Sequence, residues 1–392
     1  MKASRPIKRK IMTNPKAQYH SFAQFAGAAP ADGVTRAATQ FLNEGMAFGA
    51  GGAAYASVPK QNQLEALSIT TIEEAVGAAR AVPEAASKIL GPETVALFRS
   101  DSFINEASFR FPALRRFRDL EKRKLSFGAR LSKPRAQVET GISFDDQVPP
   151  PPRAAIGAGN AFSMSSNPCM PPIRDQGDRW TCVAFATCAL MEYAYCVAGK
   201  PGLDFSEQFH YWDTKCNDPD GYLTLGTYPD ISFSRITIAG VCKEPTWLYD
   251  MVSDPPQNAP EGPAGRPEAA GFRVPTSVSI NNYRDVPTLK NYLTNGSLIA
   301  IAIPVYSWAT NPATHDTGNI GMPLPGETSN AGHAIVLVGY ADDPAYPGGG
   351  YFILRNSYGT QWGSQCPYGA GYGTIPYQYI SLYNYSAFVI RL

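Results

Sequence analysis

The chain has 392 residues, of which 44% are hydrophobic and 11% aromatic, and its formal net charge at pH 7 is +1. This length predicts two or three domains, and the composition excludes a fully disordered chain. The small net charge gives no indication of a nucleic-acid or anionic-membrane partner. The longest weakly apolar run, GMAFGAGGAAYASV at residues 45–58, is too short and glycine-rich to span a bilayer.

The N-terminus is basic, because six lysines and arginines fall within the first sixteen residues and no acid precedes Asp32. No apolar stretch follows this basic start, as it would in a secretory signal peptide. We therefore expect residues 1–35 to be a solvated, disordered tail, with an organelle transit signal or an unconventional export signal as the alternative. Localisation stays open between the cytoplasm and export by a signal-independent route.

Residues 36–131 are expected to be mostly helical. Thr71 and Glu74 have the spacing of a capping box, and an apolar stripe at helical spacing follows them. Pro83 opens a second short helix, which Gly91 ends. The segment FPALRRFRDLEKRKLSF, at residues 111–127, fits a third, basic helix.

Four consecutive prolines within DDQVPPPPRAAIGAGN indicate an exposed linker, which we assign to residues 132–165. The following domain, residues 166–392, begins with a helix over 181–198 that Gly199 ends. Strand-like runs come later, at SLIAIAIPV, HAIVLVGY and YFILRNS, and the turn-forming ADDPAYPGGG predicts that the last two pair as a hairpin. A helical half followed by a β-rich half predicts an α+β fold with a cleft between the halves.

All seven cysteines lie beyond residue 168, and an odd number leaves at least one thiol without a partner in the chain. Cys188 and Cys196 are eight positions apart on the expected helix, about 12 Å along its axis, which is too far to bridge each other. We expect both to be small buried apolar residues, and the pairing of the others stays open. No CxxC pair or phosphate-binding glycine loop occurs, so we expect neither a metal nor another cofactor.

Cys182 is the best candidate for a nucleophile. Thr181 is a suitable N-cap, which places Cys182 in the first turn of a helix. The N–H groups and the dipole at a helix start favour negative charge, so the thiol is biased towards thiolate. Of the four histidines, His333 is the best candidate for a base, because a lone polar ring at the start of an apolar strand has little packing reason. His210 is interpreted as a structural histidine.

The expected hairpin brings a third residue to this pair. If Tyr340 lies opposite Gly350, His333 lies opposite position 357, so Asn356 on the paired strand can orient the imidazole. This proximity tolerates a shift of two residues in register. Gln176, in the loop before the helix, could add its side-chain amide to a backbone N–H in an oxyanion hole.

Four motifs, PPIRDQGDRWTCVAFA, SEQF, AGHAIVLVGY and RNSYGTQWG, resemble those of the papain (C1) cysteine peptidases, and the resemblance covers about residues 166–392. It implies a two-lobed fold, with a helical left lobe around a central catalytic helix and a β-barrel-like right lobe. It also implies that Cys182 is the nucleophile, His333 the general acid/base, Asn356 its orienting residue and Gln176 the oxyanion donor. The resting pair would be thiolate and imidazolium.

The sequence departs from the family pattern beside the nucleophile. Arg179, Trp180 and Thr181 stand where the family usually has Cys-Gly-Ser, which removes a customary disulfide. Tyr358 replaces the tryptophan that shields the Asn–His contact. The spacing between Cys182 and the histidine exceeds the usual range, and a long loop over 308–330 accounts for the excess.

Three residues are candidates for substrate binding. Trp180 replaces a glycine beside the scissile bond, and Gly226 is the nearest match to the glycine pair that lines the cleft, with Gly221 as the alternative. Trp362 could stack on substrate, or equally be a packed aromatic beside the asparagine.

We therefore expect a cysteine endopeptidase that acts on peptide or protein substrates. The alternatives are a papain-like domain that binds without turnover, and a thiol acyltransferase or isopeptidase. The N-terminal helical region, residues 36–131, is either a pro-region cut near residues 145–165 or an adaptor for a partner. Peptide specificity and oligomeric state stay open.

Overall fold

The fold is described here from a computed structural model, which covers residues 66–69, 71–108, 113–114, 117, 125–131, 142–144, 161–251, 265–329 and 331–392. The expected basic tail lies outside these residues, as do most of the expected basic helix at 111–127 and the proline-rich part of the expected linker.

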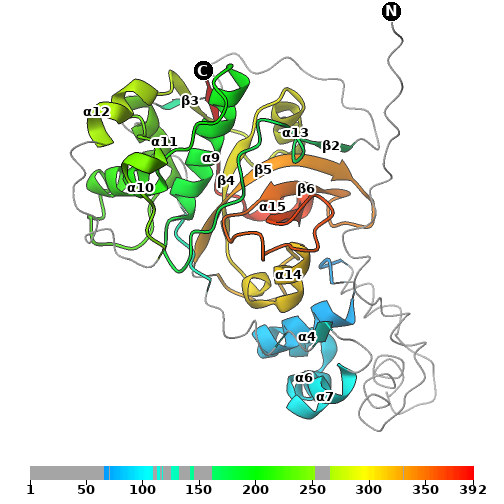
Figure 1. The fold of residues 1–392 in the computed structure, drawn as a ribbon. Helices are drawn as coiled ribbons and strands as arrows, with labels where there is room; N and C mark the ends of the chain where they lie inside the picture. Colours follow the sequence, from blue (N-terminus) through cyan, green and yellow to red (C-terminus); the bar gives the residue numbers. More distant parts are fainter. Residues whose placement is uncertain are drawn as a thin grey trace, which may run out of the picture.

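The described part of the N-terminal region contains four short helices: α4 (Ile72–Ala81), α5 (Pro83–Leu90), α6 (Pro92–Arg99) and α7 (Asp101–Ala107). The predicted capping box is confirmed, because Thr71 and Glu74 exchange two hydrogen bonds of 3.2 Å at the start of α4. Pro83 and Gly91 delimit α5 as predicted. These helices share a hydrophobic cluster of their own and lie at one end of the molecule, against α14 (Figure 1).

The α+β fold class is confirmed, with helices gathered on one side and most of the sheet on the other (Figure 1). The first group comprises α9 (Cys182–Val197), α10 (Glu207–Cys216), α11 (Pro229–Ile238), α12 (Gly265–Ala269) and the 3-10 turns η2 (Glu244–Thr246) and η4 (Ala270–Phe272). The remaining helical elements are α13 (Val286–Thr294), η5 (Ser307–Thr310), α14 (Pro312–Thr317) and α15 (Tyr377–Tyr383). The long predicted helix is confirmed as α9, which is apolar almost all round and is buried between these helices and the sheet.

Within the described residues the sheet has eight strands, in the order β1-β3-β8-β4-β5-β6-β7, with β2 also paired to β5. The strands are β1 (Ile142–Phe144), β2 (Ala161–Ser163), β3 (Thr276–Ser279), β4 (Ile299–Pro304), β5 (Gly332–Asp342), β6 (Gly350–Arg355), β7 (Tyr372–Pro376) and β8 (Ser386–Arg391). The three predicted strand runs are β4, β5 and β6. Two further strands, β1 and β2, fall within the stretch expected to be a linker, yet both pair with the sheet.

The predicted hairpin of β5 and β6 is confirmed, but the assumed register is wrong. Tyr340 pairs with Phe352 rather than with Gly350, and a β-bulge lies between Leu337 and Gly339. The assumed pairing is wrong by two residues at Tyr340. The bulge changes the register by one residue, so the error is one residue at Leu337. Gly339 accommodates the third strand there, because a Cβ at this position would lie 2.3 Å from the carbonyl oxygen of Phe162 on β2.

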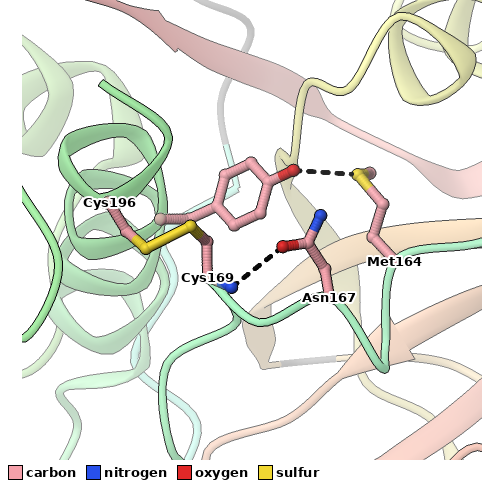
Figure 2. The surroundings of a disulfide bond; sticks show 5 residues. Met164, Asn167, Cys169 and Cys196 are labelled. Atoms are coloured by element: carbon pink, nitrogen blue, oxygen red, sulfur yellow. Dashed lines mark hydrogen bonds between the residues drawn. A yellow bond between two sulfur atoms is a disulfide. The ribbon is translucent and has the colours of Figure 1, made fainter. Parts of the chain in front are cut away.

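Cys169 and Cys196 form a disulfide, with their Cα atoms 5.4 Å apart (Figure 2). The expectation that Cys196 is a buried apolar thiol is therefore wrong, whereas Cys188 is buried and free. The bridge ties the loop before α9 to the last turn of that helix. Asn167 supports the loop by accepting a 2.9 Å hydrogen bond from the backbone N–H of Cys169. In the part of the chain that the structure describes, no helix has the length and hydropathy that a bilayer crossing needs.

Candidate active site

Cys182 is the first residue of α9, and its side chain is fully buried. Thr181 is the N-cap residue, as predicted, but its hydroxyl does not cap the helix; it lies 2.6 Å from the hydroxyl of Tyr249. The Cys182 sulfur accepts hydrogen bonds from the backbone N–H of Gly128, at 3.2 Å, and of Ala334, at 3.4 Å. The second contact places the sulfur beside the start of β5.

His333 lies at that start of β5 and is also fully buried. Its Nε2 is 2.8 Å from Oδ1 of Asn356, the residue that follows β6. This contact leaves Nδ1 as the nitrogen available to another partner, and the Tyr358 hydroxyl is 3.3 Å from it. The rings of His333 and Tyr358 stack with centroids 4.8 Å apart and planes 6° apart. The structure thus brings Cys182, His333 and Asn356 together from three distant parts of the chain.

Gln176 is buried in the loop before α9. Its Nε2 donates to the carbonyl oxygens of Ser126, at 3.1 Å, and Arg179, at 2.7 Å. Its Oε1 accepts a 2.7 Å hydrogen bond from the Ser357 hydroxyl. Ser357, the residue after Asn356, therefore holds the side-chain amide of Gln176. One N–H of that amide already donates to Ser126, which belongs to another segment of the chain.

That segment, Leu125–Leu131, is here called the covering segment, because it lies over Cys182 and His333. Its backbone pairs in parallel with Thr227: the N–H of Thr227 donates to Gly128 at 2.8 Å, and the N–H of Arg130 donates to Thr227 at 2.9 Å. On the other side, the N–H of Ala129 donates to Gly332 at 3.0 Å. The covering segment is therefore hydrogen-bonded to both halves of the site.

Two residues of the covering segment determine how closely it packs against the site. The ring of Phe127 lies edge-on to the ring of His333, with centroids 5.7 Å apart. At Gly128, an added Cβ would lie 2.0 Å from the carbonyl oxygen of Trp180, so a side chain does not fit there. This segment was not foreseen from the sequence, whose pattern predicts a basic helix over the segment's first residues. A glycine between bulky residues, in LSFGARL, was the one signal that could have found it.

The three residues expected to bind substrate have different positions. Trp180 and Gly226 flank the covering segment, and a Cβ at Gly226 would lie 2.3 Å from the carbonyl oxygen of Gly128. Trp362 has only 1% of its surface exposed and packs edge-on against Tyr358, with centroids 6.4 Å apart. Its burial in this covered site favours the packed-aromatic alternative over stacking on substrate.

Burial sets the protonation of the two central groups. It raises the pKa of the Cys182 thiol to about 11, although backbone N–H donors from Ala334 and Gly128 oppose the shift. It also lowers the pKa of the His333 imidazole to about 4, and the hydrogen bond to Asn356 only partly opposes this. Both groups are therefore neutral at pH 7 under the covering segment. The expected thiolate–imidazolium pair is not the state of this covered site.

Arg179 has a structural place in the loop before Cys182. Its Nη1 donates to Oε1 of Gln208 at 2.5 Å and to the carbonyl oxygen of Asp250 at 2.7 Å. The guanidinium carbon lies 4.8 Å from the centroid of the Tyr249 ring. These contacts hold the loop where the family would have a disulfide.

The other histidines that the structure describes lie apart from the site. His210 is buried on α10, 2.6 Å from the Ser232 hydroxyl, as expected for a structural histidine. His315 lies on α14, where the sequence analysis expected a loop. Among the described residues, no group of three or more His, Cys, Asp or Glu side chains is arranged to hold a metal ion.

Comparison with known proteins gives the family. Residues 160–375, more than half of the chain, match the model of the papain family of cysteine proteases. An uncharacterized peptidase C1-like protein of Acanthamoeba polyphaga mimivirus is 25% identical over 215 residues, which are 53% of this chain but only 65% of that protein. A cathepsin B-like protein of Giardia intestinalis is 25% identical over 227 residues, 54% of this chain and 70% of that protein.

Among solved structures, the fold is similar to that of xylellain, a cysteine protease from Xylella fastidiosa. The TM-score is 0.52 at 22% sequence identity, and the match covers 69% of this chain and 98% of that one. This likeness supports the two-lobed papain-like fold that the sequence motifs implied. The chain belongs to the papain family of cysteine proteases.

Proposed function

We propose that this protein is a cysteine endopeptidase in which Cys182 is the nucleophile and His333 the general acid/base. Asn356 is the orienting residue, and Gln176 with the backbone N–H of Cys182 forms the oxyanion hole. The proposal is supported by family membership, by the 2.8 Å contact between His333 Nε2 and Asn356 Oδ1, and by the hydrogen bond from the N–H of Ala334, the residue after His333, to the Cys182 sulfur.

The reaction would follow from these positions. The thiol of Cys182 gives its proton to Nδ1 of His333, and the sulfur attacks the peptide carbonyl carbon. The Gln176 amide stabilises the charge on the oxygen of the tetrahedral intermediate. When the C–N bond breaks, the imidazolium protonates the leaving amine. Water then attacks the thioester while the imidazole accepts its proton, and the acid product and the thiol are released.

We also propose that the covering segment, together with the helices before it, is an inhibitory pro-region rather than an adaptor. The observation that carries this proposal is the 3.2 Å hydrogen bond from Gly128 N–H to the Cys182 sulfur. The Ser126 carbonyl also accepts from Gln176, so the donor that an intermediate would need is already engaged. A peptide substrate cannot reach the sulfur until this segment leaves.

The test compares the full-length chain with its Cys182→Ala variant in mildly acidic buffer with a thiol reductant. The wild type should shorten by a cut within residues 145–160, just before β2, and should then react with a vinyl-sulfone peptide probe. The Cys182→Ala variant should stay intact. Cys216→Ser, which removes an exposed thiol of α10 that is not in a disulfide, is the matched control and should behave as the wild type.

Each alternative has a distinct outcome. If the wild type and Cys182→Ala both stay full-length while the probe labels Cys182 of the wild type, the adaptor hypothesis is supported and the pro-region hypothesis is refuted. If no probe labels the folded protein after the covering segment has been removed by an added protease, the chain is a binding protein with a papain-like fold. Transfer of the acyl group to an added amine, in preference to water, would identify an acyltransferase.

A further inference from the structure

The side chain of Arg130, in the covering segment, occupies a pocket on the loop between α10 and α11. Its Nη1 lies 2.6 Å from Asp220 and 3.5 Å from Asp218. Its Nε and Nη2 both donate to the carbonyl oxygen of Leu225, at 3.2 and 3.0 Å. The guanidinium carbon lies 5.4 Å from the centroid of the Tyr228 ring. The pocket thus contacts both edges and one face of the guanidinium.

Two aspartates of this pocket contact the guanidinium of Arg130. Asp218 is buried and already pairs with the buried ammonium of Lys215, whose other contacts are Thr224 and the carbonyl of Gly226. Asp220 is half exposed and also accepts a 2.7 Å hydrogen bond from the Tyr228 hydroxyl. The guanidinium of Arg130 thus adds a second cation, beside the Lys215 ammonium, to a site that contains the carboxylates of Asp218 and Asp220.

The pocket has a fixed relation to the candidate nucleophile. Thr227 pairs with the backbone of the covering segment on both sides of Ala129, through Gly128 and Arg130. Gly128 is also the residue whose N–H contacts the Cys182 sulfur. An extended chain bound along the backbone of Thr227 therefore places one side chain in the pocket. That side chain belongs to the residue two positions along the chain from the residue that contacts the sulfur.

We infer that this acidic pocket is a specificity site for arginine in substrates, an inference that rests on the proposed peptidase function. Substrates would carry arginine two or three residues from the bond that is cut. Arginine should be favoured over lysine, because only a guanidinium can reach both Asp220 and the Leu225 carbonyl with separate N–H groups. The same site would hold Arg130 in the latent protein and release it to substrate after processing.

The first experiment uses the self-processed enzyme and peptides that carry arginine, or its neutral isostere citrulline, at each of the three positions on either side of the cut. At one position arginine should raise kcat/KM by roughly five- to tenfold over citrulline, a modest gain because Asp220 is half exposed. The Asp220→Asn variant should bring that ratio to about one. Asp285→Asn, at an exposed N-cap where asparagine also caps, is the matched control and should keep the wild-type ratio.

The outcomes separate this inference from the function on which it rests. If the probe labels Cys182 and peptides are cut, but arginine gives no advantage at any position, the specificity site is refuted and the peptidase stands. The site is equally refuted if Asp220→Asn keeps the arginine preference. If no peptide is cut and no probe reacts, the peptidase itself has failed.

A second experiment tests the pocket without turnover, in the full-length chain. The rate at which iodoacetamide labels Cys182 reports how often the covering segment opens. Arg130→Gln and Asp220→Asn should each raise this rate by roughly five- to tenfold, and the double variant should be no faster than either one. Effects that multiply in the double variant would show that the two residues act independently, and the pocket would lose its support.

Discussion

Single residues decide the chemical state of the site. The position of Cys182 at a helix start favours thiolate, which is the state that the sequence predicts. In the folded chain burial outweighs it: the Cys182 thiol has a pKa of about 11, and His333 a pKa of about 4. A helix start favours thiolate when the thiol is open to solvent. No local sequence pattern indicates that a segment more than fifty residues earlier covers Cys182.

This difference gives a prediction for the reactivity of Cys182. At pH 7, a pKa of about 11 leaves roughly one thiol in ten thousand as thiolate. The Gly128→Val variant should displace the covering segment, since its Cβ cannot fit against Trp180. We expect it to speed alkylation of Cys182 at pH 7 by about a hundredfold or more, because the thiol returns to an ordinary pKa or lower.

The measurement is the rate of iodoacetamide modification at Cys182, located by peptide mass mapping, since other free cysteines are present. In the wild type the rate should rise about tenfold for each pH unit between 7 and 10. Gly271→Val is the control, because a Cβ there meets no atom within 4 Å. Equal rates in the wild type and Gly128→Val would contradict the covered state.

At the scale of elements, the long loop that the spacing predicted between Trp308 and Asn330 forms η5 and α14, which receive the N-terminal helices. Asn311 Nδ2 donates to the carbonyl oxygen of Glu74 on α4 at 3.2 Å, and Asn319 Nδ2 donates to its carboxylate at 3.1 Å. Gly77 makes room for this contact, because its Cβ would lie 2.0 Å from Asn311 Oδ1. The sequence showed the extra length but not its partner.

The Gly77→Val variant should detach α4 from α14 without unfolding the catalytic half. Overpacking of this kind costs about 1–3 kcal/mol, so alkylation of Cys182 should speed up by roughly tenfold. Ala81→Val, at the partly exposed end of α4, is the matched control. A Gly77→Val protein that opens no more often than the wild type would show that this contact does not hold the covering segment.

The disulfide acts at the same scale. The pairing of Cys169 with Cys196 joins residues 27 positions apart, and chain entropy gives such a link about 3.5 kcal/mol of stability. The Cys169→Ser/Cys196→Ser double variant should lose about that much free energy of unfolding in urea without reductant. Cys216→Ser should lose little. A double variant as stable as the wild type would mean that the bridge contributes nothing measurable.

Across the whole molecule, covering and proton binding are coupled. Burial lowers the pKa of His333, and Phe127 of the covering segment contributes to that burial, so the neutral imidazole favours the covered state above about pH 6.5. That preference is lost as the pH falls through about 4. The gap between 6.5 and about 4 corresponds to about 3 kcal/mol. Acid should therefore open the latent protein.

Hydrogen exchange over residues 125–131 tests this coupling in the Cys182→Ala background, where no self-cleavage occurs. After correction for intrinsic exchange, the opening free energy should fall by about 3 kcal/mol between pH 7 and pH 4. Adding His333→Gln should remove most of that dependence. If the pH profile is unchanged by His333→Gln, other groups control the opening.

The sequence alone was sufficient for the papain-like class, the central helix and the hairpin, because these depend on local periodicity and on motifs with fixed spacing. It also predicted that Cys182, His333 and Asn356 lie close together, whereas their catalytic roles, and that of Gln176, stay a prediction. Asn356 lies beside His333 although the assumed register was wrong by two residues at Tyr340 and by one residue at Val336, since neighbouring strands keep their side chains close.

Only the tertiary structure decided the disulfide partner of Cys196, the burial of Trp362 and the place of the covering segment. Each of these depends on contacts between residues far apart in the chain, for which one sequence carries no periodic signal. The neutral state of the site follows from the same cause, because burial is a property of the assembled fold.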